Sequence, residues 1–125
     1  MTDNLAIEMY RENILENYRS PKNFGKLKTL TNKAQAINKI CGDEINMELE
    51  IKNNKLTDIK FNGQGCAITM ASASLLTEKI KNMPIEKIKS LKREDALELL
   101  QIPISPIRIK CALLPLEAVQ KALNK

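Results

Sequence analysis

The sequence has no histidine and no tryptophan. Without imidazole, a metal site has to be built from thiolates, carboxylates, lysine, backbone groups or water, and general base catalysis by histidine is excluded. Aromatic residues make up only 3% of the chain, against 43% hydrophobic residues, so we expect a core of aliphatic side chains. Few aromatics also leave little surface on which nucleic-acid bases could stack.

Long apolar segments are missing as well. No run approaches the roughly 20 residues that a membrane-spanning helix needs. The first residues are neither basic nor followed by an apolar stretch, unlike a secretory signal. We therefore expect a cytoplasmic protein with no membrane partner. The 125 residues match one ordinary domain, so we expect a single domain over residues 1–125.

The net charge is +5, from 20 Lys and Arg against 15 Asp and Glu. A basic balance raises the possibility of nucleic acid as a partner. Here the lysines are spread along the chain and interleaved with acidic residues, which is typical of a solvated surface. We therefore expect no nucleic-acid partner.

Hydrophobic periodicity predicts an α+β fold: an N-terminal helix, a three-stranded antiparallel sheet, and then a set of C-terminal helices packed on one face. Strands are expected at residues 34–39, 44–51 and 56–61, with a tight turn at Asn53-Asn54. Helices are expected at residues 5–18, 67–81, 84–90 and 92–100, and from about Cys111 to about Leu123. Pro103 and Pro106 predict a stiff loop before this last helix.

Three cysteines stand at predicted element boundaries, and an odd number in a cytosolic chain argues against a disulfide framework. Cys41 precedes Gly42 and Asp43, and the glycine permits a turn that brings a thiolate and a carboxylate to one centre. Cys66 opens a helix, whose N-terminus favours a thiolate. Cys111 follows Lys110, and the ammonium group should favour a thiolate there too.

Alternative readings exist for each of these residues. Free cysteines are often small buried hydrophobes, Asp43 could be a turn or cap residue, and Lys110 could be a surface lysine. The shared placement of the three cysteines at boundaries favours one metal or iron–sulfur site formed by Cys41, Asp43, Cys66 and Cys111. No pair has CxxC spacing, so a zinc ribbon or finger is not expected.

Four segments resemble motifs of the IscU/SufU/NifU N-terminal family. They follow the family's order and cover nearly the whole chain. The segment Tyr18–Gly25 resembles the family's Tyr-x-x-Pro-x-Asn-x-Gly element. The family's three cysteine motifs are resembled, in order, by Cys41–Asp43, Phe61–Ser74 and Arg108–Leu113.

The resemblance implies a scaffold that builds a [2Fe–2S] cluster and transfers it to apo-proteins, with sulfur delivered as persulfide by a cysteine desulfurase. By family likeness Cys111 would be the main sulfur acceptor, while Cys41, Asp43, Cys66 and Cys111 would bind the cluster, or Zn²⁺ in its place. Independently of the resemblance, the ammonium group of Lys110 would offset part of the negative charge of such a site, so we expect it to have a tuning role. An aspartate is a harder, weaker ligand for such a centre than a thiolate, and a labile site suits a protein that releases its product.

Departures from the family branches keep an alternative open. Lys110 stands where IscU has histidine, and the segment Ile104–Arg108 differs from the chaperone-docking stretch of IscU, which argues against docking of the specialised Hsp70. The run Arg108–Ala112 resembles SufU, a zinc-dependent sulfurtransferase, yet the SufU insertion between the second and third cysteines is absent from residues 67–110. We expect a non-enzymatic scaffold; a SufU-like sulfur carrier and a homodimer remain open.

Overall fold

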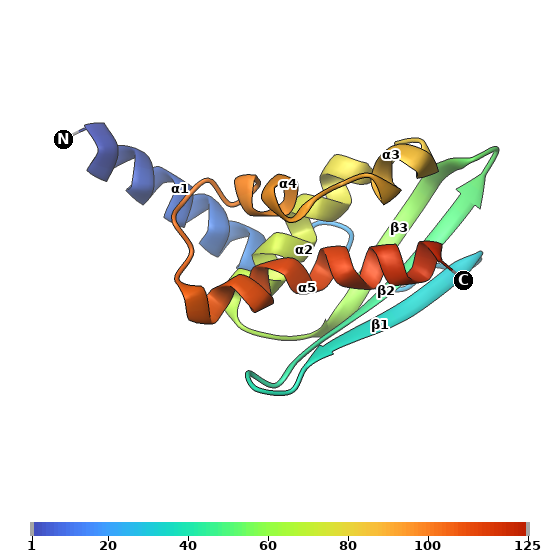
Figure 1. Cartoon of the computed structure of the whole chain (residues 1–125), viewed down its shortest axis with the longest axis horizontal. Helices are drawn as coiled ribbons and strands as arrows, with labels where there is room; N and C mark the ends of the chain where they lie inside the picture. The colour runs from blue at the N-terminus through green and yellow to red at the C-terminus, as the bar shows by residue number, and fades with distance from the viewer. Residues whose placement is uncertain (1, 125) are drawn as a thin grey trace.

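An antiparallel sheet of strands β1 (Asn32–Asn38), β2 (Asp43–Lys52) and β3 (Lys55–Gln64), in the order β1-β2-β3, lies against one group of helices (Figure 1). The computed structural model describes residues 2–124. Asn53 and Asn54 both have positive φ, 51° and 61°, as the predicted tight turn between β2 and β3 requires. The predicted α+β fold, with its helix, sheet and later helices, is confirmed.

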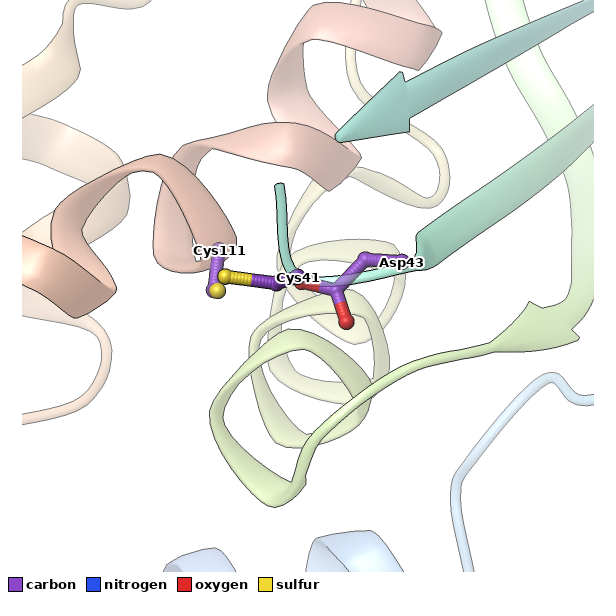
Figure 2. A group of neighbouring side chains, drawn as sticks. All are labelled: Cys41, Asp43 and Cys111. Carbon is purple, nitrogen blue, oxygen red and sulfur yellow. The ribbon is translucent and has the colours of Figure 1, made fainter. Parts of the chain in front are cut away.

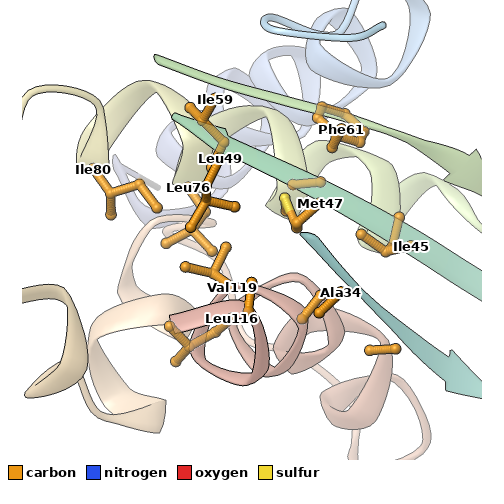
Figure 3. Close-up of a cluster of buried hydrophobic side chains, with 14 of the residues drawn as sticks. Ala34, Ile45, Met47, Leu49, Ile59, Phe61, Leu76, Ile80, Leu116 and Val119 are labelled. Carbon is orange, nitrogen blue, oxygen red and sulfur yellow. The ribbon is translucent and has the colours of Figure 1, made fainter. Parts of the chain in front are cut away.

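The core lies between the sheet and helices α2 (Ala67–Ile80) and α5 (Pro106–Leu123). Along β2 every second side chain faces the helices, and Ile45, Met47 and Leu49 are completely buried. The core is aliphatic apart from one phenylalanine, as the composition predicts (Figure 3). The sheet therefore has one buried face and one face open to solvent.

Small side chains allow α1 (Thr2–Arg19) to pack closely on α2. Ala71 and Ser74 of α2 are fully buried, and the Ser74 hydroxyl donates a hydrogen bond of 2.6 Å to the buried Asn17 Oδ1. The short helices α3 (Ile85–Lys89) and α4 (Arg93–Glu98) contact α5. Within residues 2–124, no helix is both long and apolar enough to cross a bilayer.

Helix α5 begins at Pro106, five residues before the predicted start, so the prediction of a loop through Pro106 and a start near Cys111 is wrong. Proline is favoured at the first helical position, because its missing N–H has no helical partner there and its φ already suits the helix. Pro115 lies inside the helix and cannot supply the usual N–H to the carbonyl of Cys111, four residues earlier. Cys111 is therefore a residue of the second turn rather than of the helix start.

The Tyr18–Gly25 segment covers the outer edge of β3. Asn23 has a φ of 61°. Its carbonyl accepts a hydrogen bond of 2.9 Å from the Phe61 N–H, and the Gly25 N–H donates a hydrogen bond of 2.8 Å to the Phe61 carbonyl. The rings of Phe24 and Phe61 meet edge to face at 5.4 Å. These contacts attach the chain between α1 and β1 to the strand that leads into Cys66.

Candidate metal centre

Cys41 and Asp43 enter the site from the turn that joins β1 to β2. Gly42 has a φ of 73°, a left-handed conformation that glycine adopts without strain, and it reverses the chain between the two residues. Cys41 is half-buried in the turn, whereas Asp43 begins β2 and is only 1% exposed. The structure brings this thiol and this carboxylate to one place.

Cys111 meets these two residues from α5. One ligand atom from each of Cys41, Asp43 and Cys111 lies within 4.8 Å of the other two, and Figure 2 shows the two sulfur atoms facing each other beside the carboxylate. Cys111 is completely buried, and the amide of the buried Asn38 lies 3.9 Å from its sulfur. Two segments far apart in sequence, the β1–β2 turn and α5, thus provide a compact group of two sulfurs and a carboxylate.

Cys66 stands beside this group rather than in it, at the N-cap of α2. Its backbone N–H donates to Asp43 Oδ1 at 3.2 Å, and its sulfur lies 3.4 Å from the Thr69 hydroxyl. Asp43, at the start of β2, therefore caps α2 by accepting the backbone N–H of its N-cap residue. This contact fixes the start of the helix next to the other proposed ligands. The structure places the Cys66 backbone at the site, and its thiol at the margin.

Glycines before Cys66 permit this close approach. A Cβ on Gly63 would lie 2.0 Å from the Glu44 carbonyl oxygen, and one on Gly65 would lie 3.0 Å from the side chain of Thr69 and 3.1 Å from Asp43 Oδ1. Gly63 also has a φ of 133°, which side-chain-bearing residues rarely adopt. Only glycine fits at both positions without displacing the neighbouring strand or the carboxylate.

The thiols differ in acidity. Burial raises the pKa of Cys66, but its contact with the Thr69 side chain and hydrogen bonds from the backbone at the start of α2 outweigh burial, so the pKa is lowered overall, as predicted for a helix N-terminus. Burial, followed by the neighbouring Asp43 and Cys41, raises the pKa of Cys111 from 9.0 to about 12. The prediction that Lys110 favours a Cys111 thiolate is therefore wrong.

Arg108, an exposed residue of α5 three positions before Cys111, is a second cation near the thiols. A hydrogen bond to the Cys111 thiol, together with the charges of Cys66 and Cys41, raises the pKa of the Arg108 guanidinium. Residues three apart share a helix face, whereas Lys110 is one position from Cys111 and lines the grooves beside the cluster, one with Leu113 and one with Cys41. The sequence reasoning missed Arg108 because it placed the helix start too late; a start at Pro106 would have indicated it.

An apolar rim surrounds the open side of the site. Ile40, 84% exposed, and Ile107, 76% exposed, line a shallow groove together with Cys41 and Lys110. Large apolar side chains this exposed mark surfaces that contact other proteins when they are clustered. The site is therefore reached past Cys41, across an apolar surface that carries positive charge.

The donor set suits a thiophilic metal. Thiolates bind zinc and the iron of iron–sulfur clusters, and one carboxylate oxygen can complete a tetrahedral zinc site. Cys41, Asp43 and Cys111 would supply three ligands as they stand. The Cys66 thiol is the fourth candidate, from the N-cap of α2.

Known proteins resemble the chain over almost its full length. Residues 9–125 match the family model described as the NifU-like N-terminal domain. The iron-sulfur cluster assembly scaffold protein IscU of Thermotoga maritima is 35% identical, with 94% of each chain covered. The zinc-dependent sulfurtransferase SufU of Bacillus subtilis is 33% identical, covering 94% of this chain and 90% of its own.

Solved structures share the fold. The crystal structure of FiSufU from Fervidobacterium islandicum AW-1, described as an iron-sulfur cluster assembly scaffold protein for the SUF system, superposes with a TM-score of 0.76 at 25% identity, covering 90% of this chain and 94% of its own. A NifU-like N-terminal protein from Brucella abortus also reaches 0.76, at 18% identity and 92% coverage of each chain. The second likeness concerns the fold alone.

Proposed function

The chain belongs to the family of NifU-like N-terminal domains, and from that premise we propose that it is a scaffold for iron–sulfur cluster assembly. The observation that carries the proposal is the meeting of Cys41, Asp43 and Cys111 within 4.8 Å, with Cys66 beside them. We propose that these four residues bind a [2Fe–2S] cluster as cargo, and that residues 1–125 act as one domain. Zn²⁺ is the alternative occupant.

Sulfur delivery is proposed to come from a cysteine desulfurase. The Cys111 thiolate attacks the outer sulfur of the desulfurase persulfide, an S–S bond forms at Cys111 as the old one breaks, and the desulfurase cysteine leaves as a thiolate. An external electron donor then reduces the transferred sulfur to sulfide. The exposed Ile40 and Ile107 and the adjacent Lys110 supply an apolar, cationic surface for docking at the open side.

The acidity of Cys111 suggests the order of events. With a pKa of about 12 and no exposed surface, its thiol is a poor nucleophile in the metal-free protein. A thiol that coordinates a metal ion loses its proton, so metal binding would convert Cys111 to the thiolate. Arg108 supports that charge through its contact with Cys111. We therefore propose that metal enters before sulfur.

A second candidate function is supported by the relative from Bacillus subtilis, named a zinc-dependent sulfurtransferase. In that case Zn²⁺ stays at the site and Cys111 passes the accepted sulfur to another protein. The scaffold is favoured because the segment between Cys66 and Cys111 lacks the SufU insertion, and because several relatives are named as cluster assembly scaffolds. On the scaffold reading the recipients are apo-proteins, and the chain itself is not an enzyme.

Anaerobic reconstitution tests the proposal. The protein is incubated with ferrous iron, L-cysteine, dithiothreitol and a cysteine desulfurase, and its visible absorption and Mössbauer spectra are recorded before transfer to an apo-ferredoxin. We expect a [2Fe–2S] chromophore that Cys41→Ser or Cys111→Ser abolishes. Tight Zn²⁺ binding, no chromophore and faster desulfurase turnover would instead establish the sulfurtransferase.

A further inference from the structure

Thr69 lies where Asp43 and Cys66 meet, and we propose that it is a positioning residue that aims the Asp43 carboxylate and the Cys66 thiol at the metal. Its hydroxyl is 2.9 Å from Asp43 Oδ2 and 3.4 Å from Cys66 Sγ. The side chain is completely buried. The inference rests on the proposed function, because it takes Asp43 and Cys66 as ligands.

The Thr69 hydroxyl donates to the carboxylate. A hydroxyl has one hydrogen and two lone pairs, and an ionised carboxylate can only accept. Thr69 therefore donates to Asp43 Oδ2, and the same hydroxyl contacts Cys66 Sγ. The single hydroxyl thus links two proposed ligands that come from β2 and from the start of α2.

Both oxygens of Asp43 are held by α2. Oδ1 accepts the Cys66 N–H at 3.2 Å, and Oδ2 accepts the Thr69 hydroxyl at 2.9 Å. Each carboxylate oxygen has a second lone pair, so both bonds are compatible with metal ligation. Without Thr69 the carboxylate would keep one fixed oxygen and could rotate about it, away from the sulfurs of Cys41 and Cys111.

The local sequence makes room for this threonine. A Cβ on Gly65 would lie 3.0 Å from both Cβ and Cγ2 of Thr69, tighter than side chains normally pack. The missing side chain at Gly65 therefore accommodates Thr69 as well as Asp43. Threonine also has fewer accessible rotamers than serine because it is branched at Cβ, so its hydroxyl is held more firmly.

Three variants test the role of the hydroxyl. Thr69→Val keeps the shape and removes the hydroxyl, and Thr69→Ser keeps the hydroxyl. Thr77→Val is the matched control: Thr77 is also a fully buried threonine of α2, but its hydroxyl donates to the carbonyl of Ser74, away from the site. The readouts are the Zn²⁺ dissociation constant, from competition with a chromophoric chelator, and the visible spectrum of the Co²⁺-substituted protein.

We expect Thr69→Val to weaken Zn²⁺ binding about 10- to 100-fold, the usual effect of removing a partner that orients a metal ligand. Its Co²⁺ spectrum should shift, while Thr69→Ser should restore both affinity and spectrum. Thr77→Val should lower the melting temperature and leave Zn²⁺ affinity unchanged. In an Asp43→Ala background, Thr69→Val should have a much smaller effect, because Thr69 acts largely through Asp43.

Wild-type affinity and an unchanged Co²⁺ spectrum in Thr69→Val would overturn the inference. If that variant does not fold, the comparison of Thr69→Ser with Thr69→Ala decides in the same way. The proposed function fails separately: wild-type protein would then bind neither Zn²⁺ nor a cluster, or Cys41→Ser and Cys111→Ser would leave binding intact. Metal binding that needs the cysteines but ignores Thr69 would reject only the inference.

Discussion

Cys111 should be much slower than Cys66 to react with iodoacetamide in metal-free protein. At pH 8 an ordinary thiol with a pKa of 9.0 is about one-tenth ionised, whereas a pKa of about 12 leaves about one thiolate in ten thousand. Cys66 has a lowered pKa, so its thiolate is at least about a thousandfold more abundant than that of Cys111.

Reactivity does not follow abundance alone. A more basic thiolate is the better nucleophile. With a Brønsted slope of about 0.5, a pKa higher by about three makes the Cys111 thiolate about 30-fold more reactive per thiolate. The net difference is therefore at least about 30-fold in favour of Cys66. Cys111 is also completely buried while Cys66 is half-buried, which widens the difference further.

The assay is timed alkylation of chelator-treated, reduced protein, followed by peptide mass spectrometry to measure the rate at each cysteine. In denaturant both cysteines should react alike, which controls for local sequence. Equal rates at Cys66 and Cys111 in the folded protein would refute the reasoning. They would show that the thiol of α5 is open to solvent or already ionised, and that metal is not needed to activate it.

Three further predictions follow from the same geometry. The free energy of unfolding of the metal-free protein should fall by on the order of 1 kcal/mol per pH unit between about pH 9 and 12. The reason is that the unfolded chain releases the Cys111 proton near pH 9, whereas the folded chain keeps it to about pH 12. Urea titrations at several pH values measure this slope, which should be absent in Cys111→Ala. Arg108→Ala should speed Zn²⁺ transfer to a chelator roughly two- to fivefold, as expected for one exposed charge, while Lys110→Ala should not; the reverse order would reject the assignment of Arg108. Gly63→Ala should destabilise the fold by at least about 2 kcal/mol, and Gly25→Ala by less, because Gly25 has a similar φ of 140° with open space around it; equal losses would mean that the collision with the neighbouring strand is relieved.

Much of the fold could be predicted from the sequence because its signals are local. The alternation from Ile45 to Leu49 predicts a strand with one buried face, and the pair Asn53-Asn54 predicts the turn that follows. Both are confirmed, and the strands extend beyond the predicted ends by one to three residues. The start of α5 could not be predicted in this way, because Pro106 is equally compatible with a loop and with a first helical position.

The wrong prediction about the charge beside Cys111 came from the wrong start predicted for α5. With α5 expected to begin near Cys111, Lys110 was the obvious charged neighbour. Helix α5 in fact contains both Lys110 and Cys111. The residue three positions before Cys111, Arg108, therefore shares the helix face of Cys111. Adjacent residues in a helix point in different directions, which is why Lys110 lines the grooves beside the cluster rather than sharing the helix face of Cys111.

The sequence by itself determined which residues can do chemistry here: three thiols, a nearby aspartate, no imidazole, and glycines where the backbone must turn or approach closely. These are properties of residue types and of local conformation. Only the tertiary structure decided how those groups relate. The burial that makes Cys111 a weak acid, the capping of α2 by Asp43 and the hydroxyl of Thr69 between two proposed ligands all depend on contacts between distant segments, and such contacts form only when the sheet and helices pack together.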